Sequence, residues 1–269
     1  MVLVSLVVLV VWMGESFAYR IVVLYAAASP ILKKFGLEQE VVGVTRKDNL
    51  FPQAVKVGSH LRPNIELIKA LRPDLIIAGS HRAFPEALKK AIKAEVFYYD
   101  PRNLEEILEA IRVLGRRLHR EREARALIRE LRAELSELHP LSCHPRVVYE
   151  ISQRPLKVAG QRSIITSIIK AAGGENLVKV RRKHVLISPE EVLLLSPDIY
   201  FYQVGPMNKD PVPPKERSYF SGLKSKVIQV NELSFARPGL NAFSAALKMN
   251  RLFEKFCEEK RKNLGDNQR

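Results

Sequence analysis

Two distant stretches of the chain repeat one pattern of apolar and polar positions. Residues 64–78 and 188–202 each begin with a helix-capping residue, continue with a few turns of helical periodicity, and end with a Pro-Asp pair and an apolar run. Pro73 and Pro197 should end the helices, because the residue before a proline is displaced from the helical region of backbone space. Each stretch therefore predicts a short helix followed by a buried strand.

A β-rich apolar run precedes each of these stretches. It covers residues 20–28 in the first half of the chain and 146–151 in the second, so both pairs of segments recur at nearly the same offset. Strands that alternate with helices form βαβ units on parallel sheets. The fold class that we predict is α/β, with two Rossmann-like lobes of similar build.

The segment between the lobes predicts one long helix. Asn103 is a capping residue, and no proline follows it before Pro140. Apolar residues recur at helical spacing on both sides of a polar gap between Leu118 and Leu127. A helix of ~35 residues spans ~50 Å, which is longer than one small lobe is wide. We predict a single long α-helix that joins the lobes and crosses open water at the polar gap. A coiled coil is the alternative.

The first residues have the features of a secretory signal peptide. Residues 2–13 are apolar except for Ser5, and Ser16 and Ala18 provide a small-residue cleavage site. An apolar helix of this length rises only ~18 Å, too short for a ~30 Å hydrocarbon core. No cysteine lies near Ala18, so we predict an exported, periplasmic protein without a lipid anchor. The alternative is a buried first strand. The predicted divisions are 1–18 (signal peptide), 19–102 (first lobe), 103–140 (helix) and 141–269 (second lobe).

Composition and charge narrow the function classes. Of the 269 residues, 46% are hydrophobic and 27% charged, which is typical of a globular protein and excludes disorder over most of the chain. The formal net charge of +15 suggests an anionic partner, or else the surface of a heat-stable protein. Cys143 and Cys257 cannot build a disulfide scaffold or a four-thiolate zinc site. A disulfide between them and two buried free thiols remain equally open.

Sequence motifs for catalysis are largely absent. The chain contains no phosphate-binding P-loop, no dinucleotide fingerprint, no nucleophile elbow and no HExxH or CxxC motif. His60 and His81 follow predicted strands of the first lobe, where loops face ligands in open α/β sheets. In the second lobe, the proline-rich stretch 204–218 follows a strand in the same way. We expect no enzyme activity and no cofactor of the protein's own.

Several motifs, in order, resemble one known family. They are VVGV at 41–44, FPQAVKVG at 51–58, the stretch 64–78, PLKVAG at 155–160, AAGGENL at 171–177, ISPEEV at 187–192, SPD at 196–198 and RPG at 237–239. Together they are similar to the class III periplasmic binding proteins for iron chelates and cobalamin. The resemblance implies two Rossmann-like lobes joined by one long helix, with the ligand between them. It also implies delivery of a metal chelate to the permease of a membrane ABC importer. We expect a monomer that binds no nucleic acid.

Candidate ligand-binding residues come from both lobes. The expected cleft edge is basic, and aromatic side chains supply its apolar faces: Tyr25, Phe51, His60, His81, Arg82, Arg162, His184, Phe235 and Arg237. Phe51 holds the place of an aromatic residue that precedes the Pro-Gln-Ala element in cobalamin binders. Gly79 stands where those binders have tryptophan, which weakens the cobalamin hypothesis. The resemblance also places importer-docking acids at Glu86 and, on the second lobe, Glu216.

The basic cleft favours an anionic ferric chelate such as a ferric siderophore. Arginine forms forked pairs with carboxylates, and aromatic rings cover a flat chelate. The alternative ligands are cobalamin, haem and molybdate. In the case of haem, Tyr25 could be an iron ligand. A chelatase-type enzyme on the same architecture and a ligand sensor are alternative roles. A nucleic-acid binder is disfavoured, because the chain has no basic motif interleaved with aromatic residues and begins with a signal peptide.

Overall fold

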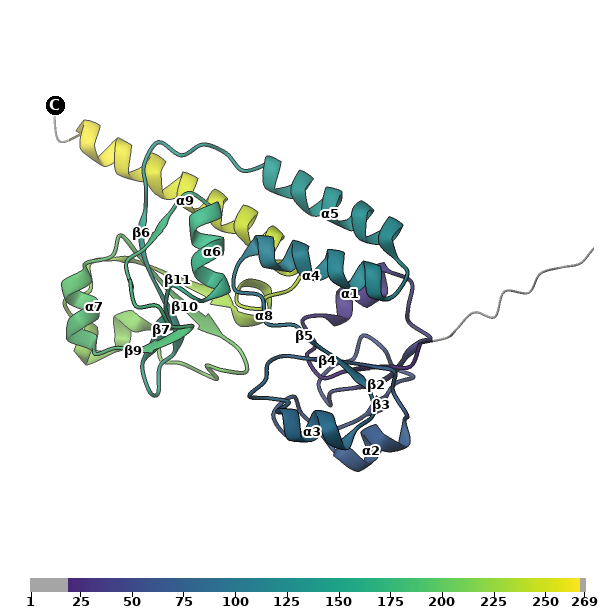
Figure 1. Cartoon of the computed structure of the whole chain (residues 1–269). Helices are drawn as coiled ribbons and strands as arrows, with labels where there is room; N and C mark the ends of the chain where they lie inside the picture. Colours follow the sequence, from purple (N-terminus) through teal and green to yellow (C-terminus); the bar gives the residue numbers. More distant parts are fainter. Residues whose placement is uncertain (1–18, 267–269) are drawn as a thin grey trace, which may run out of the picture.

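The chain folds into two lobes, each built on its own β-sheet. The computed structural model describes residues 19–266, so the predicted signal peptide at 1–18 lies outside the described residues. Figure 1 shows the lobes side by side, with helices α4, α5 and α9 along one side of the molecule. The predicted α/β fold with two lobes is confirmed. No helix of the described part of the chain has the length and apolar character needed to cross a membrane.

The first lobe is a five-stranded parallel sheet in the order β3-β2-β1-β4-β5. This is the Rossmann strand order, which reverses direction between β1 and β4. Its elements are β1 (Ile21–Val23), α1 (Ser29–Lys34), β2 (Val41–Val44), β3 (Val55–Lys56), α2 (Ile65–Ala70), β4 (Leu75–Ala78), α3 (Glu86–Ala91) and β5 (Glu95–Tyr98).

The second lobe is a six-stranded sheet in the order β11-β10-β6-β7-β9, with β8 paired to β6. Strands β11, β10 and β6 are parallel, and β7 runs antiparallel to its neighbours. The elements are β6 (Arg146–Ser152), β7 (Lys157–Ala159), α6 (Ile164–Ala171), β8 (Glu175–Asn176), β9 (His184–Leu186), α7 (Pro189–Leu195), β10 (Ile199–Val204), η1 (Pro214–Glu216), η2 (Ser218–Phe220), β11 (Lys226–Asn231), α8 (Glu232–Phe235) and α9 (Asn241–Asp266).

The internal repeat is reproduced in hydrogen bonds at the start of each central strand. The Asp74 carboxylate accepts the backbone N–H of Arg20 at 2.8 Å, and the Asp198 carboxylate accepts that of Arg146 at 2.8 Å. Each arginine side chain also donates to a carbonyl at the end of the helix before the Pro-Asp pair, again at 2.8 Å. The Pro-Asp pair therefore ends a helix and joins it to the first strand of its lobe.

Alternate residues of the central strands belong to different cores. In β1, Ile21 and Val23 enter a large core cluster, whereas Val22 packs into a smaller cluster on the other face of the sheet. The large cluster continues through α4, α5, α6 and α9 to Tyr149 and Phe201 of the second lobe. One buried core therefore extends through both lobes. Each lobe also has a smaller core of its own on the opposite face of its sheet.

The predicted single long helix is wrong: the segment forms two helices, α4 (Leu104–Arg117) and α5 (Glu121–Ser136). They lie side by side as a helical hairpin (Figure 1). The chain turns at His119, whose φ is +52°, and the N–H of Arg120 returns to the carbonyl of Gly115 at 2.7 Å. The polar gap between Leu118 and Leu127 coincides with this turn. Residues of a turn at the surface face water, so they need not be apolar.

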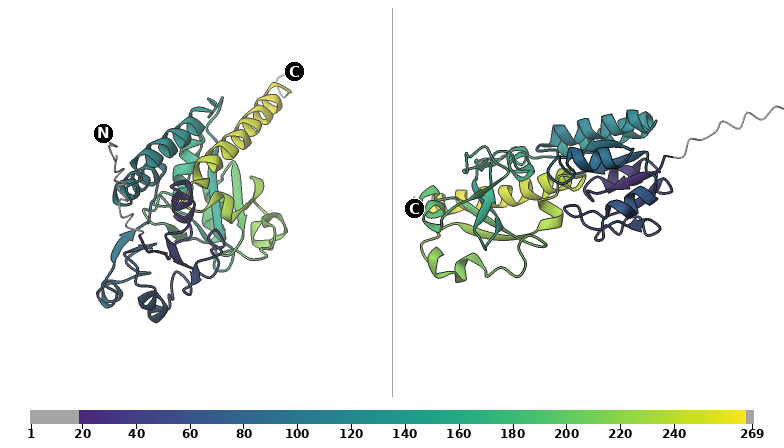
Figure 2. Two further views of the ribbon diagram at one scale, coloured as in Figure 1. Left: turned by 90° about the vertical axis from the view of Figure 1, so that its right-hand side faces the viewer. Right: turned by 60° about the horizontal axis from the view of Figure 1, so that its bottom comes forward.

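Helix α9 runs from the junction of the lobes along the second lobe to its far end (Figure 2). Cys257 in this helix pairs with Cys143, which lies between α5 and β6, with 5.6 Å between their Cα atoms. The disulfide decides between the two states that the sequence left open. It ties α9 to the start of the second lobe.

We expect Gly115→Ala to destabilise the protein. The added methyl group would lie 2.5 Å from the Ala124 Cβ, where the two helices of the hairpin touch. The resulting overpacking should lower the free energy of unfolding by about 1–3 kcal/mol, measured by urea denaturation. Gly222→Ala is the matched control, since its Cβ would meet no atom closer than 3.8 Å. Equal stability of the two variants would contradict the close helix contact.

Removal of the disulfide should also be costly. We expect the Cys143→Ser/Cys257→Ser variant to lose about 2–5 kcal/mol of unfolding free energy, because a link across a long loop restricts the unfolded chain. Thermal unfolding with and without a reductant measures this. The reductant should lower the melting temperature of the parent protein and leave that of the variant unchanged.

Candidate functional site

A cavity of about 440 Å³ lies where the two lobes meet. Five of its lining segments directly follow the carboxyl ends of parallel strands: β1, β2 and β3 in the first lobe, and β10 and β11 in the second. Ligands bind at this edge of open α/β sheets. The lining residues are 25–27, 45–47, 59–60, 206–207, 232 and 236–238.

Tyr25 lies at the point where the strand order of the first lobe reverses. Its ring is 6.3 Å from that of His60 and 6.2 Å from that of Tyr99. A Cβ on Gly79, at the end of β4, would lie 3.0 Å from the Tyr25 ring. The glycine therefore makes room for the tyrosine, and a bulky side chain at position 79 would have to displace it.

The Tyr25 phenol is held in its neutral form. Burial raises its pKa to about 12, the Asp100 carboxylate adds to this rise, and Arg237 opposes it. Desolvation also lowers the pKa of the neighbouring His60, which favours the neutral imidazole that can bind a metal. Two groups that can ligate iron therefore face the same cavity from one lobe.

The back of the cavity is a direct contact between the lobes. The Tyr99 hydroxyl donates to the carbonyl of Pro238 at 2.8 Å. A Cβ on Gly239 would lie 2.8 Å from the carbonyl oxygen of Ala27, so only glycine permits this approach of two backbones. The Arg237-Pro-Gly motif of the second lobe is thus fixed against the loop that carries Tyr25.

Charged side chains of both signs line the cavity. Arg46 and Lys47 come from the loop after β2, and Arg237 comes from the segment after α8. Glu232, which is 7% exposed, lines the second lobe and accepts the N–H of Met207 at 2.6 Å. The three cations can pair with ligand carboxylates, and Met207 offers an apolar surface.

Of the predicted ligand-binding residues, the structure brings Tyr25, His60 and Arg237 together in this cavity. His81 and Arg82 lie instead on the exposed loop after β4, where the His81 ring stacks on Tyr98 with 3.6 Å between ring centres. These two are outside the cavity lining, because Tyr25 occupies the space beside the end of β4.

Arg162 and His184 also lie outside the lining, on the β7–β9 side of the second lobe. The N–H of Arg162 donates to the carbonyl of Arg182 at 3.1 Å, and the Arg162 side chain is exposed. His184 begins β9, and burial, with the charges of Lys183 and Lys157, lowers its pKa.

The two phenylalanines are core residues. Phe51 is completely buried in the shared core, Phe235 is 9% exposed in the same core, and neither residue lines the cavity. The structure thereby contradicts the contact role that we predicted for them. Phe51 lies in the loop between β2 and β3, and Phe235 ends the short helix α8. The sequence places both beside motifs but does not show whether their side chains point into the core or into the cavity.

The sequence missed Arg46, Lys47, Met207 and Glu232. The first two directly follow β2, so the rule that loops after parallel strands face the ligand would have found them. Met207 lies within the proline-rich stretch 204–218 that the same rule had already marked. Glu232 begins a helix of only four residues and has no motif of its own.

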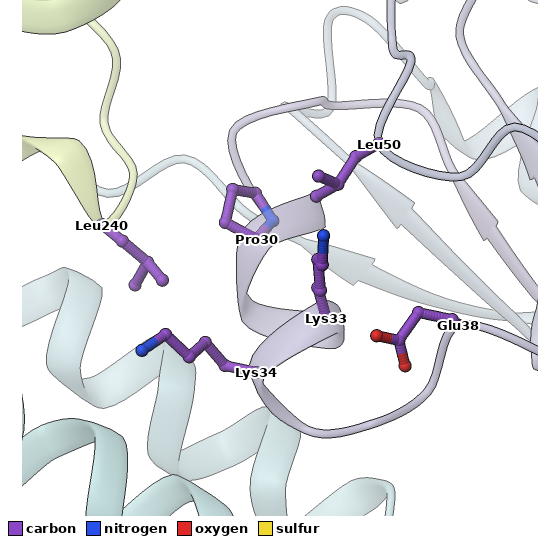
Figure 3. Close-up of a pocket in the computed structure, with 6 residues that line it drawn as sticks. All are labelled: Pro30, Lys33, Lys34, Glu38, Leu50 and Leu240. Carbon is purple, nitrogen blue, oxygen red and sulfur yellow. The ribbon is translucent and has the colours of Figure 1, made fainter.

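A second, more open cavity of about 340 Å³ lies beside α1. Figure 3 shows Lys33 and Lys34 on the helix, with Leu50 and Leu240 nearby. Lys34 also forms an ion pair with Glu130 of α5 at 2.7 Å. None of the predicted ligand-binding residues lines this cavity, so we place the site between the lobes.

The chain belongs to the periplasmic binding protein family, whose pattern it matches over residues 21–213. This match confirms the resemblance that the sequence motifs indicated. The family assignment covers the first lobe, the helical hairpin and much of the second lobe.

One similar protein is named as part of a heme uptake system. The chain is 26% identical over 196 residues to the High-affinity heme uptake system protein IsdE of Staphylococcus aureus, and the match covers 69% of this chain and 66% of that protein. The chain thus spans slightly less than two thirds of that relative.

Solved structures share the fold. The S. aureus IsdE structure complexed with heme has a TM-score of 0.77 at 24% identity, covering 87% of this chain and 98% of that one. The heme-binding protein RhuT from Roseiflexus sp. RS-1 gives 0.73 at 21% identity, covering 89% and 99%. The vitamin B12 binding protein BtuF of Vibrio cholerae gives 0.70 at 21% identity, covering 88% and 97%.

Arg237→Ala should weaken the binding of an anionic chelate. The loss of one charge-assisted hydrogen bond corresponds to about 1–3 kcal/mol, measured by titration of the protein with haem. Arg82→Ala is the matched control, because Arg82 is an exposed arginine outside the cavity lining. Equal losses in both variants would show that overall charge, rather than a contact in the cavity, attracts the ligand.

Proposed function

We propose that the protein captures haem, or a closely similar anionic ferric chelate, and delivers it to the permease of an ABC importer. The observation that carries this proposal is the cavity between the lobes, where the Tyr25 phenol and the His60 imidazole face three cationic side chains. The fold and the family assignment support a binding role, and several proteins similar to this chain are named as heme uptake or heme-binding proteins.

Haem matches the chemistry of this cavity better than the other candidate ligands. A phenolate or an imidazole can occupy an axial position on haem iron. The two haem carboxylates need cationic partners, which Arg46, Lys47 and Arg237 supply. A hexadentate ferric siderophore shares the negative charge but saturates its iron with its own donor atoms, and so leaves Tyr25 and His60 without a role as iron ligands. Molybdate would leave most of the cavity unfilled.

Cobalamin is a weaker candidate. Tyr25 occupies the space beside Gly79, the position at which cobalamin binders are expected to carry tryptophan. Cobalamin is also a much larger molecule than haem, whereas the cavity measures about 440 Å³. A corrinoid ring would in addition present amide groups to Arg46 and Arg237, which pair better with carboxylates.

Glu86 and Glu216 are our proposed contacts with the permease. Glu86 begins α3 on the first lobe, its side chain is 57% exposed, and it lies 3.5 Å from Lys89. Glu216 ends η1 on the second lobe and is also exposed. With one acid on each lobe, arginines of the permease would form ion pairs with both lobes at once. We further propose that residues 1–18 direct export and are removed.

Coordination through Tyr25 predicts a pH-dependent affinity. The phenol, with its pKa raised to about 12, is protonated at neutral pH, so coordination as phenolate must release a proton. Haem affinity should therefore increase with pH between 6 and 9, by up to about tenfold per unit for a single released proton. Visible absorption titrations of the parent protein and Tyr25→Phe, at several pH values, measure the difference. The variant should lose this increase, and a common pH dependence would exclude coordination by Tyr25.

Reversal of the Glu86 charge separates docking from binding. We expect Glu86→Arg to keep its haem affinity and to abolish import in cells or in vesicles that contain the cognate permease. Glu66→Arg, on helix α2 of the same lobe, is the control, because Glu66 is likewise an exposed acid in an i,i+3 ion pair with a lysine. Loss of haem affinity in Glu86→Arg would refute the docking role.

A further inference from the structure

A tight turn at the end of β10 projects two residues into the cavity. Gly205 and Asn208 close this turn with two backbone hydrogen bonds of 3.2 and 3.0 Å. Pro206 and Met207, between them, line the cavity. Met207 is 49% exposed, so its side chain is available to a ligand. We call residues 205–208 the pocket turn.

The side chain of Asn208 fixes one end of the pocket turn. Asn208 is 5% exposed, and its amide nitrogen donates to the carbonyl of Gln203 at 2.8 Å and to the Glu150 carboxylate at 3.3 Å. Its amide oxygen accepts the N–H of Gln153 at 2.9 Å. The turn is therefore bound to both β6 and β10 through a single buried amide.

Glu150 is the centre of a buried polar network. Arg217 forms a forked pair with its two carboxylate oxygens, at 2.5 and 3.0 Å, and the Tyr200 hydroxyl donates to it at 2.6 Å. The side chains of Glu150 and Arg217 are 0% and 1% exposed. Burial and the charge of Glu150 raise the pKa of Tyr200, so its hydroxyl remains a donor.

Arg217 also closes the proline-rich segment on itself. Its Nε donates to the carbonyl of Val212 at 2.7 Å, and the N–H of Val212 donates to the Gln153 side chain at 2.9 Å. The segment between the pocket turn and η2 is thus attached to Glu150 in β6 and to Gln153 directly after this strand. On the cavity side, the Glu232 carboxylate accepts the N–H of Met207 at 2.6 Å.

A buried ion pair of this kind adds little stability compared with an apolar pair of the same shape, because removing two charges from water is costly. It does favour one arrangement strongly, since any other would leave a buried charge unpaired. Here every oxygen of Glu150 has a partner, and the partners come from β10, the pocket turn and the segment before η2. The network therefore specifies where the pocket turn lies.

We propose that the Arg217–Glu150 pair is a positioning device that holds the pocket turn over the cavity, and that Met207, on this turn, is a ligand-contacting residue. The choice of haem as the ligand rests on the proposed function. The positioning role does not, because it concerns the protein before any ligand binds.

Hydrogen exchange of the ligand-free protein tests the positioning role. The double variant Glu150→Gln/Arg217→Met removes both charges together and keeps side chains of similar size, so that no buried charge is left unpaired. We expect amides of residues 205–212 to exchange at least about tenfold faster than in the parent protein, while amides of β6 and β10 keep their protection. Lys34→Met/Glu130→Gln is the control, because it removes an exposed ion pair of 2.7 Å remote from the pocket turn.

Unchanged exchange in 205–212 would overturn the positioning role. Equal acceleration throughout the second lobe would overturn it as well, since the pair would then stabilise the lobe as a whole. Should the double variant fail to fold, Arg217→Lys provides the second measurement. Lysine keeps the positive charge but cannot form the forked pair with both oxygens of Glu150. We expect the same faster amide exchange, again limited to residues 205–212.

Haem titration of a double-mutant cycle tests the role of Met207. We expect Met207→Ala and the neutral pair each to weaken haem binding by about tenfold, and the combined variant to bind no more weakly than Met207→Ala alone. Additive losses, or none, would overturn the claim that the pair acts through Met207. If the parent protein binds no haem, the proposed function fails while the exchange result still decides the positioning role.

Discussion

The shared hydrophobic core is the constraint on which the rest of the structure depends. Its residues come from the inner faces of both sheets and from α4, α5, α6 and α9. Two domains connected only by a linker move freely, but a large apolar interface fixes their relative position. Because these helices are packed into one core with both sheets, the lobes have little freedom to separate, and the cavity between them is largely preformed.

The position of the cavity follows from this constraint. Parallel strands leave their carboxyl ends at one edge of each sheet, and the shared core holds those two edges facing each other. The contact of Ala27 with Gly239, and the hydrogen bond from Tyr99 to Pro238, close the back of the cavity. Side chains from five strand ends then converge on a space that neither lobe forms alone. A ligand bound there would contact both lobes, and the two acids that we propose as permease contacts lie one on each lobe.

Local sequence rules predicted the repeated elements well. The Pro-Asp pairs, for example, end α2 and α7, and each aspartate bonds to the first strand of its lobe. The same rules failed for the inter-lobe segment, where continuous helix-forming sequence concealed the turn at His119. A non-glycine residue at positive φ is uncommon, so the local sequence shows no sign of this turn; in the structure α4 and α5 pack closely there, with Gly115 against Ala124.

The sequence by itself determined the family, the two α/β lobes and three of the cavity residues, Tyr25, His60 and Arg237. These depend on short-range patterns: strand periodicity, helix ends and motifs beside strand ends. Only the tertiary structure decided that Phe51 is a core residue, that Cys143 pairs with Cys257, and that Arg46, Met207 and Glu232 share the cavity with Tyr25. The physical reason is that these outcomes depend on the direction in which each side chain leaves the backbone and on contacts between residues far apart in the chain. Local patterns carry neither, because both are set when the two lobes pack around one core.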